Sequence, residues 1–259
     1  MIFDSHAHYD DAKFDEDRAQ LLNSMAACGI GYIVNVGADL ESTKRSLLLA
    51  EQYPFIYAAC GVHPSDAAQL DEIEDGFDQL RKYCSHEKCV AVGEIGLDYY
   101  WDKEDDVRSR QKYWFEQQLL LSKEMNLPII IHSRDAAKDT LDMMKSQAGQ
   151  GTRGVMHCFS YSVEIAREYL NMGYYLGIGG VVTFANAKAI KEVVRYAPIE
   201  QILLETDCPY LAPVPNRGKR NSSLNLPYVA EMIAELKHMH KEDVIDITCK
   251  NAKNMYGIA

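Results

Sequence analysis

Short apolar runs alternate along this chain with longer stretches whose apolar positions recur at helical spacing. Several short runs are apolar at consecutive positions, which is typical of strands buried on both faces of a parallel sheet. Alternation of such strands with helices predicts βαβ units. The predicted strands cover residues 1–5, 31–36, 55–60, 89–93, 128–132, 153–157, 174–178 and 202–205. The predicted helices cover residues 17–28, 40–52, 67–84, 105–126, 134–147, 162–172 and 186–196, followed by a helix pair within 225–257.

The number and order of these elements predict an α/β fold with the architecture of a (β/α)8 TIM barrel. The length of 259 residues matches the roughly 250 residues of one such barrel. No linker, low-complexity tract or change of composition interrupts the chain, so we expect residues 1–259 to form a single domain. Residues 206–224 form the longest stretch without a helix or strand pattern, and long loops in compact domains are often functional.

Residues typical of helix ends support these boundaries. Asp39 and Ser162 stand where N-caps are expected, because their side chains can accept hydrogen bonds from the first unpaired N–H groups of a helix. The acidic run 71–75 is expected to be the solvated first turn of a helix. Three glycines stand where helices are expected to end: Gly29, Gly149 and Gly173.

Potential metal ligands follow the apolar runs of five predicted strands. In a parallel barrel the carboxyl ends of all strands open on one face, so side chains far apart in the sequence converge there. Four imidazoles and two carboxylates on that face would form a hydrolytic metal site with room for two ions. These residues are His6, His8, Glu94, His132, His157 and Asp207.

The chemistry of each residue suggests its role. His6 and His8 are two positions apart on a strand end and therefore point to the same side, where both can bind one ion. Glu94 directly follows a buried strand, where an unpaired carboxylate is costly but one that bridges two cations is favourable. Asp207 can bind metal and accept a proton from bound water, so we expect Asp207 and Glu94 to be catalytic. Taken singly, each of these residues also fits a polar or salt-bridged strand end.

Other residues near these strand ends are candidates for supporting roles. Asp4 is expected to accept a hydrogen bond from an imidazole, and Glu205 to support the ligands or the backbone behind them. His63 and Arg134 are expected to hold substrate phosphate. A basic loop could likewise offset phosphate charge or simply be solvated, and its cations are Arg217, Lys219 and Arg220.

Charge and aromatic content narrow the kind of nucleic acid that such a site could bind. The formal net charge of −11 argues against a broad basic face for duplex DNA, although not against a local basic site. Aromatic side chains near the predicted ligands could stack the bases of a single strand, but such residues more often pack loops. These residues are Tyr99, Tyr100, Trp101, Phe159 and Tyr161.

The remaining composition is that of an ordinary soluble domain, with 47% hydrophobic and 25% charged residues. No apolar run approaches the roughly 18 residues that cross a bilayer, and no secretory signal is visible. The seven cysteines are odd in number and include no C-x-x-C pair, which indicates reduced and mostly buried thiols. We therefore expect a cytoplasmic protein without a membrane partner, and a monomer.

The motifs together resemble the TatD family of metal-dependent deoxyribonucleases, within the amidohydrolase-like barrel group. This resemblance implies a distorted TIM barrel whose divalent metal is bound by the six ligand candidates above. It also implies Mg²⁺-dependent hydrolysis of DNA, with 3′→5′ exonuclease action on single strands. Many binuclear amidohydrolases bridge their metals with a carboxylated lysine, and Glu94 in the corresponding place favours phosphodiester chemistry. The resemblance rests on residues 4–8, 61–64, 93–98, 131–134, 157–160, 205–207, 217–221 and 251–257.

Two departures from the family pattern leave the substrate open. Tyr161 stands where the family often has glycine, and Ser222 and Ser223 follow Asn221 where the family often has Asn-Glu-Pro. The metal is open too, because carboxylates favour Mg²⁺ or Mn²⁺ whereas imidazoles also suit Zn²⁺, with one or two ions per chain. An alternative function is a metal-dependent hydrolase of a carboxylic ester, amide or lactone. The complete ligand set argues against a third possibility, a non-catalytic nucleic-acid-binding protein.

Overall fold

The computed structural model describes residues 1–259 and contains eight strands and ten α-helices. Each strand is followed in the chain by at least one α-helix before the next strand begins. The chain divides into two compact units. The first unit comprises residues 1–35 and 158–259, and the second comprises residues 36–157. The expectation of a single domain stays a prediction.

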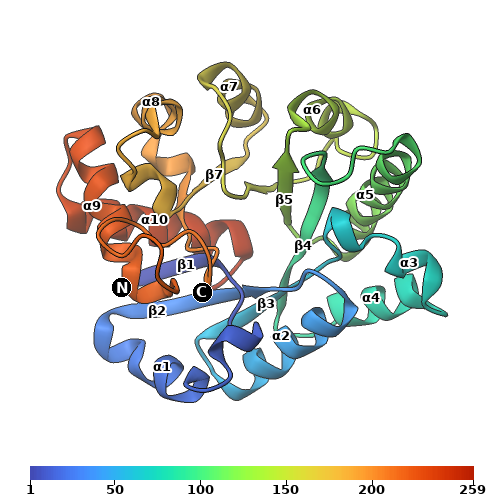
Figure 1. The fold of residues 1–259 in the computed structure, drawn as a ribbon, viewed down its shortest axis with the longest axis horizontal. Helices are drawn as coiled ribbons and strands as arrows, with labels where there is room; N and C mark the ends of the chain where they lie inside the picture. The colour runs from blue at the N-terminus through green and yellow to red at the C-terminus, as the bar shows by residue number, and fades with distance from the viewer. The chain divides into compact units, whose positions relative to one another are not determined.

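The first unit contains two parallel strand pairs, β1 with β2 and β7 with β8, and Figure 1 shows β1 beside β2. The strands of this unit are β1 (Ile2–Ala7), β2 (Ile30–Val36, its last residue in the second unit), β7 (Tyr175–Ile178) and β8 (Ile202–Leu204). Its helices are α1 (Arg18–Ser24), α7 (Val163–Asn171), α8 (Lys188–Tyr196), α9 (Leu226–Lys237) and α10 (Lys241–Tyr256). Its 3₁₀ turns are η1 (Ala12–Phe14), η2 (Ala26–Cys28), η4 (Gly180–Thr183), η5 (Ile199–Gln201) and η6 (Ser223–Asn225).

The C-terminal helix α10 is fastened to both strand pairs of the first unit. The Phe3 ring stacks between the rings of Tyr32 and Tyr256, with centroid distances of 5.3 and 5.8 Å. The Tyr256 hydroxyl donates a hydrogen bond to the carbonyl of Ser5 over 2.8 Å. The buried Asn251 amide donates to the carbonyl of Ile199 in η5 and to that of Ile202 at the start of β8. The predicted C-terminal helix pair is therefore confirmed.

The second unit carries the remaining parallel strands, and its register pairs β3 with β4, β4 with β5 and β5 with β6. Helices α2 and α4 contact β3, and α5 contacts β4 (Figure 1). Its strands are β3 (Ile56–Cys60), β4 (Cys89–Asp98), β5 (Ile129–Arg134) and β6 (Gly154–Met156). Its helices are α2 (Leu40–Gln52), α3 (Gln69–Glu72), α4 (Gly76–Cys84), α5 (Asp105–Met125) and α6 (Ala137–Lys145), with the 3₁₀ turn η3 (Pro64–Asp66).

Strands β4 and β5 run further than their apolar pattern predicts. The sequence predicts ends at residues 93 and 132, but pairing continues from Ile95 with Ile131 to Asp98 with Arg134. Glycine makes this close approach possible, because a Cβ at Gly96 would lie 1.9 Å from the carbonyl oxygen of His132. Glu94 therefore lies within β4 rather than after it, and His132 lies two residues before the end of β5 rather than at its end.

The predicted helix 67–84 is wrong as a single helix. It consists of α3 and α4, separated by Ile73 in an extended conformation and by Asp75 at φ 57°. Asp71 and Glu72 of the acidic run lie in the first turn of α3, as expected, whereas residues 73–75 form the turn between the two helices. The Asp71 carboxylate also accepts a 2.9 Å hydrogen bond from the indole of Trp114 on α5.

The predicted helix ends agree with the structure in part. Asp39 caps α2, accepting a 2.6 Å hydrogen bond from the backbone of Ser42. Gly29 and Gly173 adopt the left-handed conformation, at φ 84° and 85°, beyond η2 and α7. Ser162 precedes α7 without a side-chain cap and instead hydrogen-bonds the Glu164 carboxylate, which lowers the pKa of that carboxyl. Gly149 lies beyond the end of α6 and leaves room for the backbone of Met144.

The cysteines, the helices and the loop 206–224 are the subject of three further predictions from the sequence. All seven cysteines are free, and four of them are buried, as expected for reduced thiols. None of the helices has both the length and the apolar character that spanning a bilayer would require. The predicted loop 206–224 contains no α-helix or strand and ends at the turn η6.

Candidate metal centres

The first unit brings together three of the predicted ligands at the ends of β1 and β8. The Nε2 atoms of His6 and His8 are 3.0 Å apart. The Asp207 carboxylate lies 3.4 Å from the His8 Nε2 and 3.8 Å from the His6 Nε2. Asp207 adopts a left-handed backbone conformation, at φ 56°, and its N–H donates to the His6 carbonyl. We call these three residues the His–His–Asp cluster.

The donor set of this cluster fits a divalent cation. Two nitrogen ligands at about 2.1 Å from one ion, at a right angle, are about 3.0 Å apart, which is the separation found for His6 and His8. Imidazole nitrogens suit transition-metal ions, and a carboxylate oxygen suits these as well as Mg²⁺. All three donor atoms lie within 4.8 Å of one another. Binding a cation here would require both imidazoles to present unprotonated Nε2 atoms.

Asp4 supports this cluster in another way than the sequence predicts. Its carboxylate is fully buried and accepts hydrogen bonds from the backbone of His6, from Thr206 and from the Ser223 hydroxyl. None of these partners is an imidazole, and the expectation that Asp4 orients a histidine ring stays a prediction. Burial raises the pKa of Asp4 to about 7, although its hydrogen bonds oppose that rise. Asp4 thus ties the backbone of β1 to the end of β8.

Glu205 serves the backbone, one of the two roles expected for it. The side chain is fully buried, and one carboxylate oxygen accepts a 2.6 Å hydrogen bond from the N–H of Cys158. Gly177 leaves space for this carboxylate, because a Cβ there would lie 2.1 Å from a Glu205 oxygen. The hydrogen bond holds Cys158 in its left-handed conformation at φ 45°.

The second unit gathers the other three predicted ligands around Glu94. Its Oε1 atom lies 2.8 Å from the Nδ1 of His132 and 3.9 Å from the Nε2 of His157. A fourth residue, Asp98, lies 3.1 Å from the Nε2 of His132. Glu94, Asp98 and His157 are buried. We call these four residues the Glu94 cluster.

The pKa of His132 indicates that the carboxylates of this cluster stabilise a positive charge. Burial disfavours the charged imidazole, but hydrogen bonds to Asp98 and Glu94 outweigh burial and raise the pKa of His132 to about 9. Burial likewise tends to raise the pKa of Asp98, and the contact with His132 lowers it below its usual range. Two carboxylates therefore already stabilise positive charge at this point, and a metal ion could replace the proton.

His63 joins the Glu94 cluster at its edge. Its ring packs edge-on against the His132 ring at a centroid distance of 4.3 Å. The Nδ1 atom of His63 accepts a hydrogen bond from the N–H of Ser65, so the neutral ring carries its proton on Nε2. Donor atoms of His63, Asp98 and His132 lie within 4.8 Å of one another. This placement agrees with a substrate contact next to the predicted ligands.

Asp98 is the site residue that the sequence reasoning missed. It lies beyond residue 93, where the sequence predicts that this strand ends. Side chains four positions apart on a strand share a face, so Asp98 points the same way as Glu94 once the strand continues. The sequence signal for it is the period of two after residue 93, because the apolar residues Ile95 and Leu97 alternate with Glu94, Gly96 and Asp98.

The side chains that are expected to contact phosphate differ in exposure and in whether their charge is already paired within the protein. Arg220 makes a bidentate pair with Asp17 and donates to the Lys13 carbonyl, so its charge is compensated within the protein. That contact does not support its expected phosphate role. The Arg217 guanidinium lies 4.2 Å from the Phe184 ring centroid, and Lys219 is exposed. Arg134 ends β5 and is exposed.

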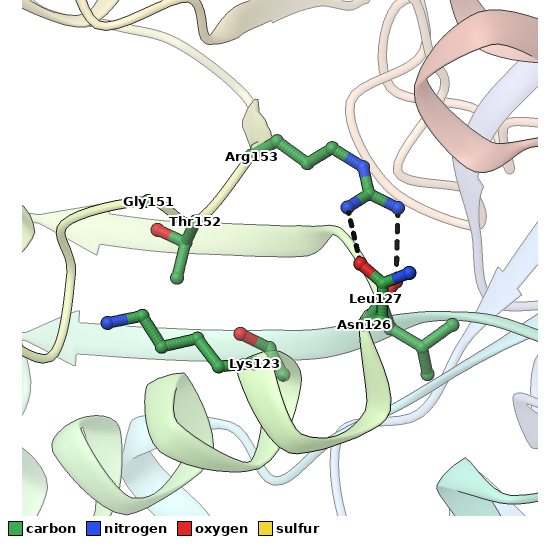
Figure 2. Close-up of a pocket in the computed structure, with 7 residues that line it drawn as sticks. Lys123, Asn126, Leu127, Gly151, Thr152 and Arg153 are labelled. Atoms are coloured by element: carbon green, nitrogen blue, oxygen red, sulfur yellow. Dashed lines mark hydrogen bonds between the residues drawn. The ribbon is translucent and has the colours of Figure 1, made fainter.

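One pocket of the second unit lies away from all of these residues (Figure 2). It is found where α5 ends and β6 begins, at the opposite end of the strands from His132. Figure 2 shows Arg153 directed at Asn126, to which it donates hydrogen bonds of 3.2 and 3.0 Å. A cation at the end of a helix is favourable, so we interpret this pocket as structural. It is lined by Ser122, Lys123, Asn126, Leu127, Gly151, Thr152 and Arg153.

Known proteins place this chain in a family. The model of the family described as TatD related DNase matches residues 3–257. The chain belongs to the TatD family. The metal-dependent hydrolase YabD of Bacillus subtilis is 46% identical over 258 residues, covering 100% of both chains. The metal-dependent hydrolase TatD of Mycobacterium tuberculosis is 35% identical over 262 residues, covering 99% of this chain and 98% of the relative.

Solved structures of TatD-family proteins share the fold. YjjV, a TatD homologue from Escherichia coli, has a TM-score of 0.89 at 31% identity and covers 100% of this chain and 98% of its own. A TatD-family hydrolase from Entamoeba histolytica, at 24% identity, has a TM-score of 0.88 over 100% and 99% of the two chains. The predicted (β/α)8 TIM barrel of metal-dependent hydrolase type is confirmed. This TatD-family chain is a metal-dependent hydrolase.

Proposed function

We propose that this TatD-family hydrolase is a deoxyribonuclease that degrades single-stranded DNA from its 3′ end. The observation that carries the proposal is the match of a DNase family model over residues 3–257 of a chain that retains all six predicted ligands. The imidazoles and carboxylates of these ligands gather within each unit, as metal binding requires. A role in DNA repair or degradation, in the cytoplasm, follows from the same proposal.

The proposed metal ligands come from both clusters. The His–His–Asp cluster supplies His6, His8 and Asp207, and the Glu94 cluster supplies Glu94, His132 and His157. We propose Mg²⁺ as the physiological ion, with Mn²⁺ or Zn²⁺ as substitutes and one or two ions per chain. A bound divalent cation would polarise a phosphate oxygen and make a bound water more acidic.

The protein side chains then act on water and phosphate. Asp207 is partly exposed, so its carboxylate can accept a proton from the attacking water. His63 presents the Nε2–H group, which can donate to a phosphate oxygen beside His132. Arg134 and the exposed Lys219 can offset the negative charge that grows on the phosphate in the transition state. Glu94 holds both neighbouring imidazoles in position.

Replacing either catalytic carboxylate should abolish DNA cleavage. Glu94→Ala and Asp207→Ala each remove a charge that the proposed metal and water require, and we expect kcat to fall at least about 1,000-fold. The measurement is a gel assay on 5′-labelled single-stranded DNA, using protein stripped of metal and resupplied with Mg²⁺, Mn²⁺ or Zn²⁺. A stepwise ladder that depends on both metal and Asp207 is the expected result.

The matched control is Lys138→Ala, which removes an exposed charge that is paired with Asp142 and has no part in either cluster. This variant should keep the ladder. Near-normal rates in Glu94→Ala or Asp207→Ala, with metal dependence intact, would contradict the assignment of the site. A folded, metal-loaded protein that cleaves no DNA but hydrolyses esters, amides or lactones would instead establish the alternative function on the same barrel.

A further inference from the structure

Two aromatic side chains are exposed directly after β4. Trp101 is 67% exposed and Tyr100 is 44% exposed, whereas the second tryptophan of the chain, Trp114, is 7% exposed. Tryptophan is usually well buried because its large apolar surface is costly to hydrate. The two rings meet edge-to-face at a centroid distance of 4.6 Å. The more exposed ring, that of Trp101, offers a surface on which a flat group could stack.

Arg134 completes this surface from the end of β5. Its guanidinium lies 3.9 Å from the centroid of the Tyr100 ring and 5.7 Å from that of the Trp101 ring. Such contacts hold the side chain over the rings while its N–H groups stay available at the surface. We call Tyr100, Trp101 and Arg134 the aromatic platform.

The neighbouring Tyr99, in contrast, packs against other side chains of the second unit. Its hydroxyl donates a 2.9 Å hydrogen bond to Asp139, and the guanidinium of Arg108 lies 4.4 Å from its ring centroid. Both the hydroxyl group and one ring face of Tyr99 are therefore used in contacts within the second unit. Trp101 has no comparable hydrogen bond from its side chain and keeps two thirds of its surface exposed.

Asp98 fixes the aromatic platform beside the Glu94 cluster. One oxygen of this carboxylate accepts hydrogen bonds from the N–H groups of Tyr100 and Trp101, at 2.9 and 3.4 Å. The other oxygen lies 3.1 Å from the Nε2 of His132. A ligand held on the platform is therefore held at a set position relative to the proposed metal ligand His132.

The charge around the platform selects the part of a nucleotide that can lie on it. The segment after Trp101 carries Asp102, Glu104, Asp105 and Asp106 against one cation, Lys103, so its net negative charge would repel phosphate on that side. Arg134 is the cation of the platform and can hold phosphate on the other side. An uncharged, flat and aromatic group is thus the chemistry that fits over the exposed Trp101 ring, beside Tyr100.

We propose that the aromatic platform is a subsite that stacks an unpaired nucleobase of the DNA strand, with a phosphate of that strand held by Arg134. This inference rests on the proposed deoxyribonuclease function and adds to it a preference between single-stranded and paired DNA ends. Stacking needs an open base face, and the faces of bases in a duplex are already covered by their neighbours. The subsite therefore favours single-stranded ends over paired ones and tolerates any base.

Binding can be measured through Trp101 itself. In a full-length Trp114→Phe variant Trp101 is the only tryptophan, and a chelator prevents cleavage during titration. We expect oligo-dT to quench the Trp101 fluorescence, and an abasic oligonucleotide of equal length and charge to bind about tenfold more weakly with little quenching. Equal affinity for the two oligonucleotides would overturn the proposal.

Turnover gives an independent measurement. Trp101→Ala should raise KM for single-stranded DNA about tenfold while kcat changes less than twofold, and Trp101→Phe should restore most of the affinity. The abasic oligonucleotide should show no such difference between variants. Tyr196→Ala is the matched control, because Tyr196 is 48% exposed on α8 and has no part in either cluster.

The outcomes separate this proposal from the function on which it rests. Normal cleavage of single-stranded DNA by Trp101→Ala, with an unchanged KM, would overturn the platform and leave the deoxyribonuclease intact. Base-dependent quenching without cleavage by any metal-loaded form would support the platform and overturn the deoxyribonuclease. The absence of both base-dependent binding and cleavage would overturn both.

Discussion

At the scale of single residues, Asp98 connects the chemistry of the second unit to its surface. Its two oxygens have different partners, with the His132 ring on one side and the backbone of Tyr100 and Trp101 on the other. The carboxylate charge favours a cation at His132, whereas its hydrogen bonds to the backbone need only an acceptor. The two functions can therefore be separated by substitution.

Asp98→Asn should lower activity without loosening the loop. An amide oxygen can still accept from Tyr100 and Trp101, but the charge beside His132 is lost, so we expect kcat to fall about 10- to 100-fold. Asp98→Ala should lower kcat by a similar factor and also make the Trp101 side chain more mobile. The greater mobility should appear as lower fluorescence anisotropy in the Trp114→Phe background. An Asp98→Asn variant with normal kcat would show that this charge has no part in the reaction.

At the scale of elements, the length of β4 determines which residues enter the site. Its ladder with β5 continues past Glu94 because Gly96 lets the two backbones meet. Gly96 adopts φ 147°, a conformation that residues with a side chain rarely reach. The continued pairing turns Asp98 to the same face as Glu94 and places the aromatic platform directly after the strand end.

Gly96→Ala should therefore be strongly destabilising. The new Cβ would lie 1.9 Å from the His132 carbonyl oxygen, in addition to the backbone strain, and we expect a loss of at least about 3 kcal/mol of unfolding free energy. The measurement is urea unfolding of the metal-free protein. Gly151→Ala is the control, because Gly151 has φ 81° but nothing within 4 Å of its Cβ position, and it should cost only about 1 kcal/mol. Equal losses in the two variants would contradict the importance of this close approach.

At the scale of the whole molecule, the protein is acidic although its proposed substrate, DNA, is an anion. The net charge is −11, and the two clusters bring together buried or partly buried carboxylates at strand ends. Cations bound there would compensate local negative charge, so the metal should stabilise the fold as well as take part in the reaction. Screening by salt should then weaken DNA binding, which depends on few local cations.

Metal should raise the stability of the native protein by mass action. At a free concentration of Mn²⁺ 100 times its Kd we expect a gain of about 2.7 kcal/mol, seen as a rise in Tm. His6→Ala should lose most of this gain, whereas Arg220→Ala should retain it. A Tm that does not respond to Mg²⁺, Mn²⁺ or Zn²⁺ would refute a bound metal at these residues.

Much of this protein could be predicted from its sequence, because the relevant signals are local. The alternation of apolar runs with helical spacing follows from backbone periodicity, and it placed the eight strands to within a few residues. The ligand candidates could be proposed because they share one position, the end of a buried strand, in a fold that brings the strand ends to one face. Asp39 could be assigned as a cap for the same reason, since its partner Ser42 is three residues away.

Only the tertiary structure decided how distant side chains are used. Arg220 is compensated by Asp17, which lies 203 residues away in the chain, and Asp4 meets Ser223 across 219 residues. The extension of β4 to Asp98 depends on the neighbouring strand, and the break between α3 and α4 coincides with a contact to α5. Local periodicity carries no information about such partners, because burial and charge pairing are determined by segments that meet only in the folded chain.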